Sequence, residues 1–95
     1  MNNDQNSAVI NLVQAMLGSV TPNWRAVFVQ GDSRSISVTF VLATESLEDR
    51  EQIADVTFEF EALQPDSDVV ITVLVSGVPI DNFSDAGRMI FARKE

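Results

Sequence analysis

Apolar residues recur at two different spacings along the chain, and the changes of spacing mark the expected elements. In the first segment they lie three or four residues apart, at Val9, Leu12, Val13 and Met16. This spacing predicts a helix over 8–17, with Ser7 or Asn6 as its N-cap and Gly18 directly after its end. The polar start predicts a disordered N-terminal arm over 1–6, followed by a single domain over 7–95.

The next two segments are rich in Val, Ile, Phe and Thr and predict a β-hairpin. Strands are expected over 24–30 and 35–43, on either side of the turn-forming residues 31–34. In the second strand the apolar residues occupy every other position: Ile36, Val38, Phe40 and Leu42. This alternation predicts a sheet with one covered face and one largely solvated face.

A second helix is predicted over 47–64. Ser46 and Asp49 form a partial capping box, with Asp in place of the usual Glu or Gln. The apolar positions Ile53, Val56, Phe60 and Leu63 share one helical face. Residues 56–61 also alternate as a strand would, so a strand remains open there, although the length of the segment and its charged flanks favour the helix.

The last third of the chain predicts two more strands. The nearly continuous apolar run over 68–76 is typical of a central strand, and residues 88–93 are short enough for a final strand after the loop 79–87. The elements follow the order α-β-β-α-β-β. We therefore expect an α+β fold, with about four strands in a mainly antiparallel sheet and two helices on one face.

Composition narrows the classes of function. The chain of 95 residues has 14 Asp and Glu against 6 Lys and Arg, a formal net charge of -8, and neither Cys nor His. Thiolate and His-based catalysis and the common zinc sites are therefore excluded, and we expect no enzyme activity, cofactor or metal. The negative charge opposes direct binding to nucleic acid or an anionic membrane. Without a bilayer-length apolar run or a secretory signal, a cytoplasmic protein is expected.

The acidic residues are concentrated in one segment. Residues 45–61 hold seven acids and one Arg, which together carry -6 of the net charge. On the predicted helix, four of them fall in one sector opposite the apolar face: Glu48, Glu51, Asp55 and Glu59. Such a stripe is either a solvated face that keeps a small domain soluble or an attractive surface for a basic partner.

Phe58 lies beside the acidic stripe on the predicted helix and bears on whether the stripe is a protein interface. On the same helical wheel it points toward the sector of Glu51 and Asp55, away from the apolar face. An aromatic ring within a charged rim is typical of protein interfaces. Alternatively, a neighbouring element buries the ring as an ordinary core residue, and the sequence leaves both outcomes open.

Several short segments, spread over most of the chain, form a recognisable set: LGSVTPNWRAV over 17–27, EDRE over 48–51, the segment 55–64 with EFEA over 59–62, GR over 87–88 and FARKE over 91–95. Together they resemble a family of small bacterial immunity proteins of contact-dependent growth inhibition systems. The resemblance implies a cytoplasmic antidote that binds the C-terminal toxin domain delivered by a neighbouring cell. Residues 89–92 depart from the expected bulkier or Tyr-containing end.

The residues and the resemblance lead to one hypothesis of function. Many such toxins are nucleases with basic sites, so we expect an immunity protein that binds and neutralises a toxin, with Glu48, Glu51, Asp55, Phe58 and Glu59 contacting it. The alternative is a structural or regulatory homo-oligomer in which the Val-rich strand or an open edge pairs with its copy. A homodimer therefore stays open as well. The basic cluster of Arg88, Arg93 and Lys94 is expected to protect the edge of the last strand or to neutralise the acidic helix.

Overall fold

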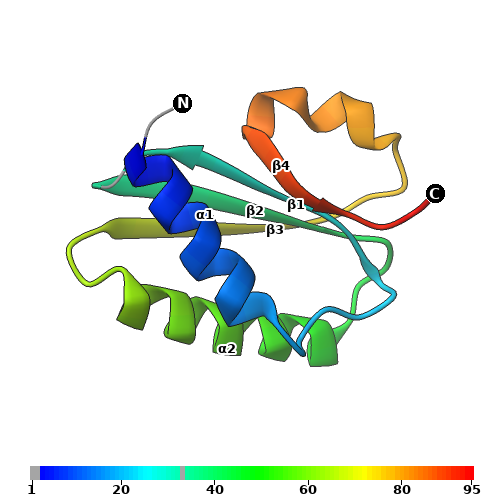
Figure 1. Cartoon of the computed structure of the whole chain (residues 1–95). Coiled ribbons are helices and arrows are strands. Elements are labelled where there is room, and N and C mark those ends of the chain that lie inside the picture. Colours follow the sequence, from blue (N-terminus) through cyan, green and yellow to red (C-terminus); the bar gives the residue numbers. More distant parts are fainter. Residues whose placement is uncertain (1–2, 33) are drawn as a thin grey trace.

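The computed structural model describes residues 3–32 and 34–95 and contains one four-stranded sheet with helices on both of its faces (Figure 1). In chain order the elements are α1 (Asn3–Met16), β1 (Trp24–Gly31), β2 (Ser35–Leu42), α2 (Leu47–Leu63), β3 (Asp68–Val75), the 3-10 helix η1 (Ile80–Ala86) and β4 (Arg88–Ala92). The strand order across the sheet is β3-β2-β1-β4. The predicted α+β class is confirmed, and the predicted order of elements is matched in part because η1 precedes the last strand.

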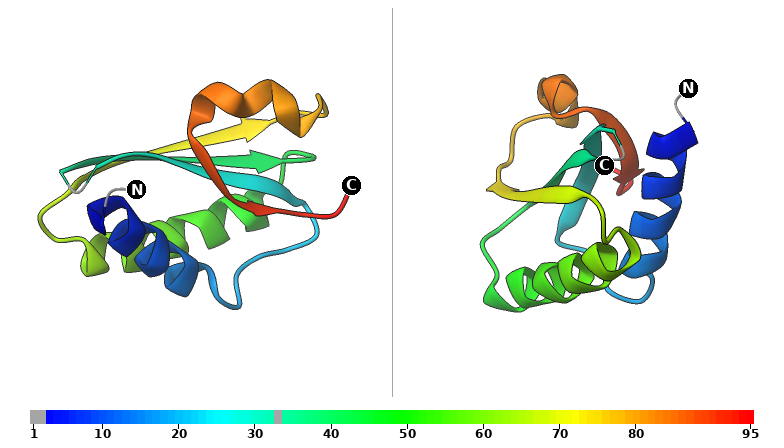
Figure 2. Two further views of the ribbon diagram at one scale, coloured as in Figure 1. Left: turned by 45° about the horizontal axis from the view of Figure 1, so that its top comes forward. Right: turned by 90° about the vertical axis from the view of Figure 1, so that its left-hand side faces the viewer.

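Helices α1 and α2 cover one face of the sheet, and η1 covers part of the other (Figure 2). Between the two helices and the sheet lies the main core, which is built around Trp24, Phe40 and Phe60. The rings of Trp24 and Phe40 meet edge to face, with their centroids 5.4 Å apart. The alternation seen in β2 directs its apolar positions into this core, as the sequence predicts.

The opposite face of the sheet carries a small second core. Ala26, Phe28 and Val41 are buried there beneath Ile80 and Phe83 of η1. The expectation that only one face is covered is therefore wrong where η1 crosses β1 and β2. Gly87 ends η1 at a φ of 113°, and a Cβ at this position would collide with the Val29 carbonyl oxygen. Only glycine therefore allows β4 to come so close beside β1.

The sheet is mixed rather than mainly antiparallel throughout. Strand β1 pairs antiparallel with both β2 and β4, whereas β2 and β3 are parallel. The parallel pairing has a simple cause: α2 carries the chain from the end of β2 back to the start of β3, so both strands run in the same direction. Strand β3 is also an edge strand, and the central position expected for it is wrong.

The predicted bounds are close to the observed ones for α2 but not for the start of α1. Helix α1 begins at Asn3, five residues before the predicted start, and ends at Met16. The expected disordered arm over 1–6 is thus helical from Asn3, while residues 1–2 lie outside the described part. Helix α2 ends at Leu63 with Gln64 as its C-cap, within one residue of the prediction, and residues 56–61 are helical rather than extended.

Candidate functional site

The start of α2 is fixed by a buried carboxylate. The Ser46 side chain accepts a hydrogen bond from the backbone N–H of Asp49, which confirms the predicted cap. The Asp49 carboxylate in turn accepts from the Thr21 hydroxyl at 2.8 Å and from the Asn23 amide at 2.7 Å. Burial by itself raises the pKa of Asp49, but the hydrogen bonds from Thr21, Asn23 and Ser46 outweigh it and hold the pKa below its usual value.

This anchoring sets the rotation of α2 about its axis. Asp49, Ile53, Val56 and Phe60 point inward and are buried. The predicted stripe therefore points outward, and all four of its residues are exposed: Glu48, Glu51, Asp55 and Glu59. Among the described residues, none of these four carboxylates has an ion-pair or hydrogen-bond partner. Four like charges three or four residues apart repel one another, by a few tenths of a kcal/mol per pair.

Phe58 lies on the solvent side of α2, where 78% of its surface is exposed. The question that the sequence left open is thereby answered, because neither α1 nor β3 covers the ring. Its neighbours one turn away along the helix are Ala54 and Asp55 on one side and Glu61 and Ala62 on the other. The ring thus stands beside the stripe of free carboxylates.

Two shallow grooves meet at Phe58. One lies between α2 and β3, has a volume of about 410 Å³, and is lined by Arg50, Ile53, Ala54, Thr57, Phe58, Glu61, Ile71 and Val73. The other lies between α1 and α2, has a volume of about 360 Å³, and is lined by Gln14, Ala15, Phe58, Glu59, Ala62 and Leu63. Both linings are mainly apolar. The ring therefore stands as a ridge between two apolar depressions on a charged face.

Not every acid of the segment 45–61 belongs to this surface. Asp49 is turned inward, and Glu45 forms a salt bridge with Arg50 at 2.5 Å. The inward direction of Asp49 could have been predicted from the helical wheel, because Asp49 precedes Ile53 by four residues and therefore lies on the same face of the helix. Its partners Thr21 and Asn23 are too distant in sequence for any local pattern to indicate them.

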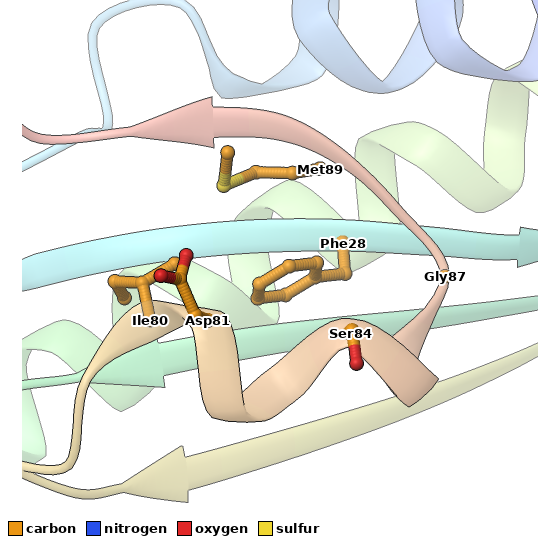
Figure 3. Close-up of a pocket in the computed structure, with 6 residues that line it drawn as sticks. All are labelled: Phe28, Ile80, Asp81, Ser84, Gly87 and Met89. Carbon is orange, nitrogen blue, oxygen red and sulfur yellow. The ribbon is translucent and has the colours of Figure 1, made fainter.

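A different depression lies on the opposite face of the sheet, beside η1 (Figure 3). It has a volume of about 380 Å³ and is lined by Phe28, Ile80, Asp81, Ser84, Gly87 and Met89. Its walls are mostly apolar, with the Phe28 ring between η1 and Met89 of β4 (Figure 3). Asp81 and Ser84 are its polar side chains, and they come from η1.

The described part of the chain holds neither a cluster of metal ligands nor a helix that could span a membrane. Over residues 3–32 and 34–95, no three Asp or Glu side chains gather closely enough to hold a metal ion. Within the same ranges, no helix combines the length and the apolar character that crossing a bilayer requires.

Comparison with known families supplies the decisive observation. The family model of the MafI2 immunity protein matches residues 5–95, which is nearly the whole chain. The chain belongs to the MafI2 immunity protein family. The resemblance to bacterial immunity proteins inferred from the sequence is thereby confirmed. No curated protein matches the chain.

Membership of the MafI2 family implies a cognate toxin as partner. The described surface must therefore contain a region that meets another protein. The face around Phe58 is one candidate. An exposed apolar stripe on and after α1, formed by Ile10, Val13, Leu17 and Val20, is a second. The second lacks the surrounding charge of the first, since those four positions carry no acidic residue between them over 10–20.

Two basic residues of this MafI2 family member, Arg25 and Arg93, pair with Glu95 at the C-terminal end of the chain. Arg25 is almost fully buried, and its guanidinium donates to both carboxylate oxygens of Glu95, at 2.7 and 2.8 Å, and to the carbonyls of Ser76 and Val78. Arg93 donates to Glu95 at 2.9 Å. The expectation that the C-terminal basic cluster neutralises the acidic helix finds no support in these contacts. Sequence reasoning missed the role of Arg25, whose partners are 51 to 70 residues away.

Proposed function

We propose that this chain neutralises its cognate toxin domain by binding it with the exposed face of α2. Glu48, Glu51, Asp55 and Glu59 attract the toxin, and Phe58 inserts into it as the anchor. The toxin is the C-terminal domain of a contact-dependent growth inhibition protein, and its activity is that of a nuclease. The immunity protein itself performs no catalysis and acts in the cytoplasm.

The exposure of Phe58 is the observation that carries the proposal. A Phe side chain that stays in water gains none of the roughly 1.5–3 kcal/mol that burial would give it. The fold does not use this ring, because the core beneath α2 is filled by Ile53, Val56 and Phe60. An aromatic ring that folding leaves in water is well suited to bury itself against a partner, and such rings are frequent hot spots of binding energy.

The electrostatics support a basic partner. The chain carries a net charge of -8, and the free carboxylates of α2 concentrate part of it beside the proposed anchor. A nuclease must hold phosphate groups and therefore presents cationic residues at its active site. Attraction between two such surfaces accelerates their encounter by about 10- to 1,000-fold. Once bound, an acidic protein also excludes the nucleic acid, because it covers the cationic surface of the nuclease that would hold the phosphates.

Inhibition of this kind requires no chemistry from the chain. It requires rapid association, which charge provides, and slow dissociation, which buried apolar contacts provide. The two grooves beside Phe58 give the toxin complementary depressions for its own side chains. Charge, ring and grooves are all supplied by the same helix and its immediate neighbours.

The direct test is to co-express the chain with the inactivated or active toxin domain encoded beside its gene. The proposal predicts that the chain restores growth against the active domain and co-purifies with the inactive one. Phe58→Ala is expected to weaken both effects, whereas Leu17→Ala on the α1 stripe is the matched control and is expected to preserve them. Failure of the native chain to bind or protect would contradict the proposal. A concentration-dependent dimer without toxin binding would instead favour the homo-oligomer.

A further inference from the structure

Strand β3 leaves one whole edge of the sheet open. The backbone N–H of Asp68 donates to the Arg34 carbonyl at 2.7 Å, and that of Ser76 donates to the Leu42 carbonyl at 3.0 Å. Since hydrogen-bonding direction alternates along a strand, every even-numbered residue between them faces β2. The odd-numbered residues therefore direct their N–H and C=O groups to the open edge: Val69, Ile71, Val73 and Val75.

The two edge strands, β4 and β3, differ in how well they are protected against pairing with a further strand. Strand β4 has only five residues, pairs with β1 through an irregular register at Val27 and Phe28, and carries Arg88 at its start. These are the usual devices that prevent an edge from pairing with another chain. Strand β3 has eight residues, a regular register along its whole length, and no Lys, Arg or Pro. It is therefore a good template for a further strand.

The side chains of β3 also lack the cover that a neighbouring strand would give. Val69, Ile71 and Val73 face α2 but are only half-buried, and Val70 on the other face is 57% exposed. The groove between α2 and β3 runs beside this edge, with Ile71 and Val73 in its wall. Its opposite wall includes Phe58 and Glu61 of α2. An added strand would place every second side chain toward this groove.

We propose that the toxin adds an extended strand to the open edge of β3 and places apolar and basic side chains in the groove beside α2. This inference rests on the proposed function and specifies the geometry of the same contact. Backbone hydrogen bonds to the odd-numbered residues of β3 hold the strand, as in other cases of strand addition. Apolar side chains meet Ile71, Val73 and the Phe58 ring, and a cationic side chain reaches Glu61.

Charge favours a toxin strand over a second copy of this chain. Pairing of two β3 edges would join two molecules that each carry a net charge of -8, and the acidic helix α2 of each lies across the groove from its β3 strand. A basic strand reverses the sign of that interaction. Arg50, at the other end of the groove, does not oppose a basic partner strongly because Glu45 neutralises it.

Amide hydrogen exchange, resolved by residue, tests the inference on the intact chain. The probe is the inactivated toxin domain encoded beside the gene, added in excess. The amides of Val69, Ile71, Val73 and Val75 are expected to exchange rapidly in the free chain and at least about 100-fold more slowly in the complex. The amides of Val70, Thr72 and Leu74 face β2 and serve as internal controls, because they are protected in both states.

Each result decides between the alternatives. Slower exchange at the odd-numbered amides only with toxin supports strand addition. A complex that perturbs α2 but leaves these amides unprotected overturns strand addition and leaves the proposed function standing. Absence of any complex overturns both. Protection that appears without toxin and grows with protein concentration shows that a second copy occupies the edge, and it overturns the inference as well.

Discussion

Thr21 and Asp49 are joined by a hydrogen bond of 2.8 Å, in which the Thr21 hydroxyl donates to the buried carboxylate. The bond connects the loop between α1 and β1 to the first turn of α2. Asn23 donates to the second oxygen of the same carboxylate from the same loop. The position of α2, and with it the direction of the acidic face, thus depends on one inward-facing acid.

Asp49→Asn is therefore expected to destabilise the fold. The new amide would bring an N–H group against the donating amide of Asn23, which leaves buried polar groups without partners. The free energy of unfolding should fall by about 1–3 kcal/mol, measured by urea denaturation. Asp55→Asn on the exposed side of α2 is the matched control, and it should stay within about 0.5 kcal/mol of the native chain. Equal stability of both variants would contradict the anchoring role of Asp49.

The second prediction concerns the pair formed by Arg25 and Glu95. Hydrogen bonding to Arg25, reinforced by Arg93, outweighs desolvation and lowers the pKa of Glu95 from 4.5 to about 2. Because the folded-state pKa lies below the unfolded value, the unfolded chain takes up a proton first as the pH falls. The pair therefore contributes fully to the stability of the fold above pH 4.5. This contribution is lost as the pH falls from 4.5 to about 2.

Glu95→Gln should remove this part of the acid sensitivity. Melting temperatures at neutral pH and at pH values on either side of the transition are the measurement. The variant is expected to be less stable than the native chain at neutral pH and to lose less stability on acidification. Glu48→Gln, which removes an exposed carboxylate without a partner among the described residues, is the matched control. If the melting temperature of Glu95→Gln fell on acidification as much as that of the native chain, the pair would not couple stability to pH.

The third prediction separates folding from binding at Phe58. Because 78% of the side chain is exposed, Phe58→Ala should change the free energy of unfolding by no more than about 0.5 kcal/mol. Toxin affinity should nevertheless fall by about 2 kcal/mol or more, which is roughly 30-fold in Kd. Titration calorimetry against the inactivated toxin domain would measure the loss.

Leu17→Ala provides the comparison on the other exposed apolar surface, because 74% of Leu17 is exposed on the α1 side. Its affinity for the toxin should stay within about threefold of the native value, as expected for a residue outside the interface. If Leu17→Ala weakened binding and Phe58→Ala did not, the α1 stripe rather than α2 would be the contact surface.

The sequence was most informative where structure depends on neighbours within one helix. Spacing alone placed Ile53, Val56 and Phe60 inward and the acidic stripe outward, and Ser46 marked the helix start. Leu63, expected on the same inward face, is 43% exposed at the end of the helix. Whether Phe58 was covered could not be decided in this way. Its exposure depends on how α1 and β3 flank α2 without covering the ring, which is a property of the whole fold.

The apolar run of β3 was misleading for a physical reason. Val69, Ile71 and Val73 pack beneath α2, while Val70 and Leu74 lie on the other face, so both faces of an edge strand carry apolar residues. Such a run looks like that of a central strand buried on both sides. A signal for the parallel pairing did exist, because a helix of 17 residues between two strands favours a crossover connection.

If the acidic face of α2 attracts the toxin, the rate of association must depend on salt through the carboxylates of that face. The double variant Glu51→Lys with Asp55→Lys should associate more than about 10-fold more slowly at low salt, with a much weaker dependence on salt. The matched control reverses two exposed acids of η1, Asp81→Lys with Asp85→Lys, and should retain most of the native rate. An unchanged rate and an unchanged salt dependence for the α2 variant would show that the toxin does not bind the acidic face of α2.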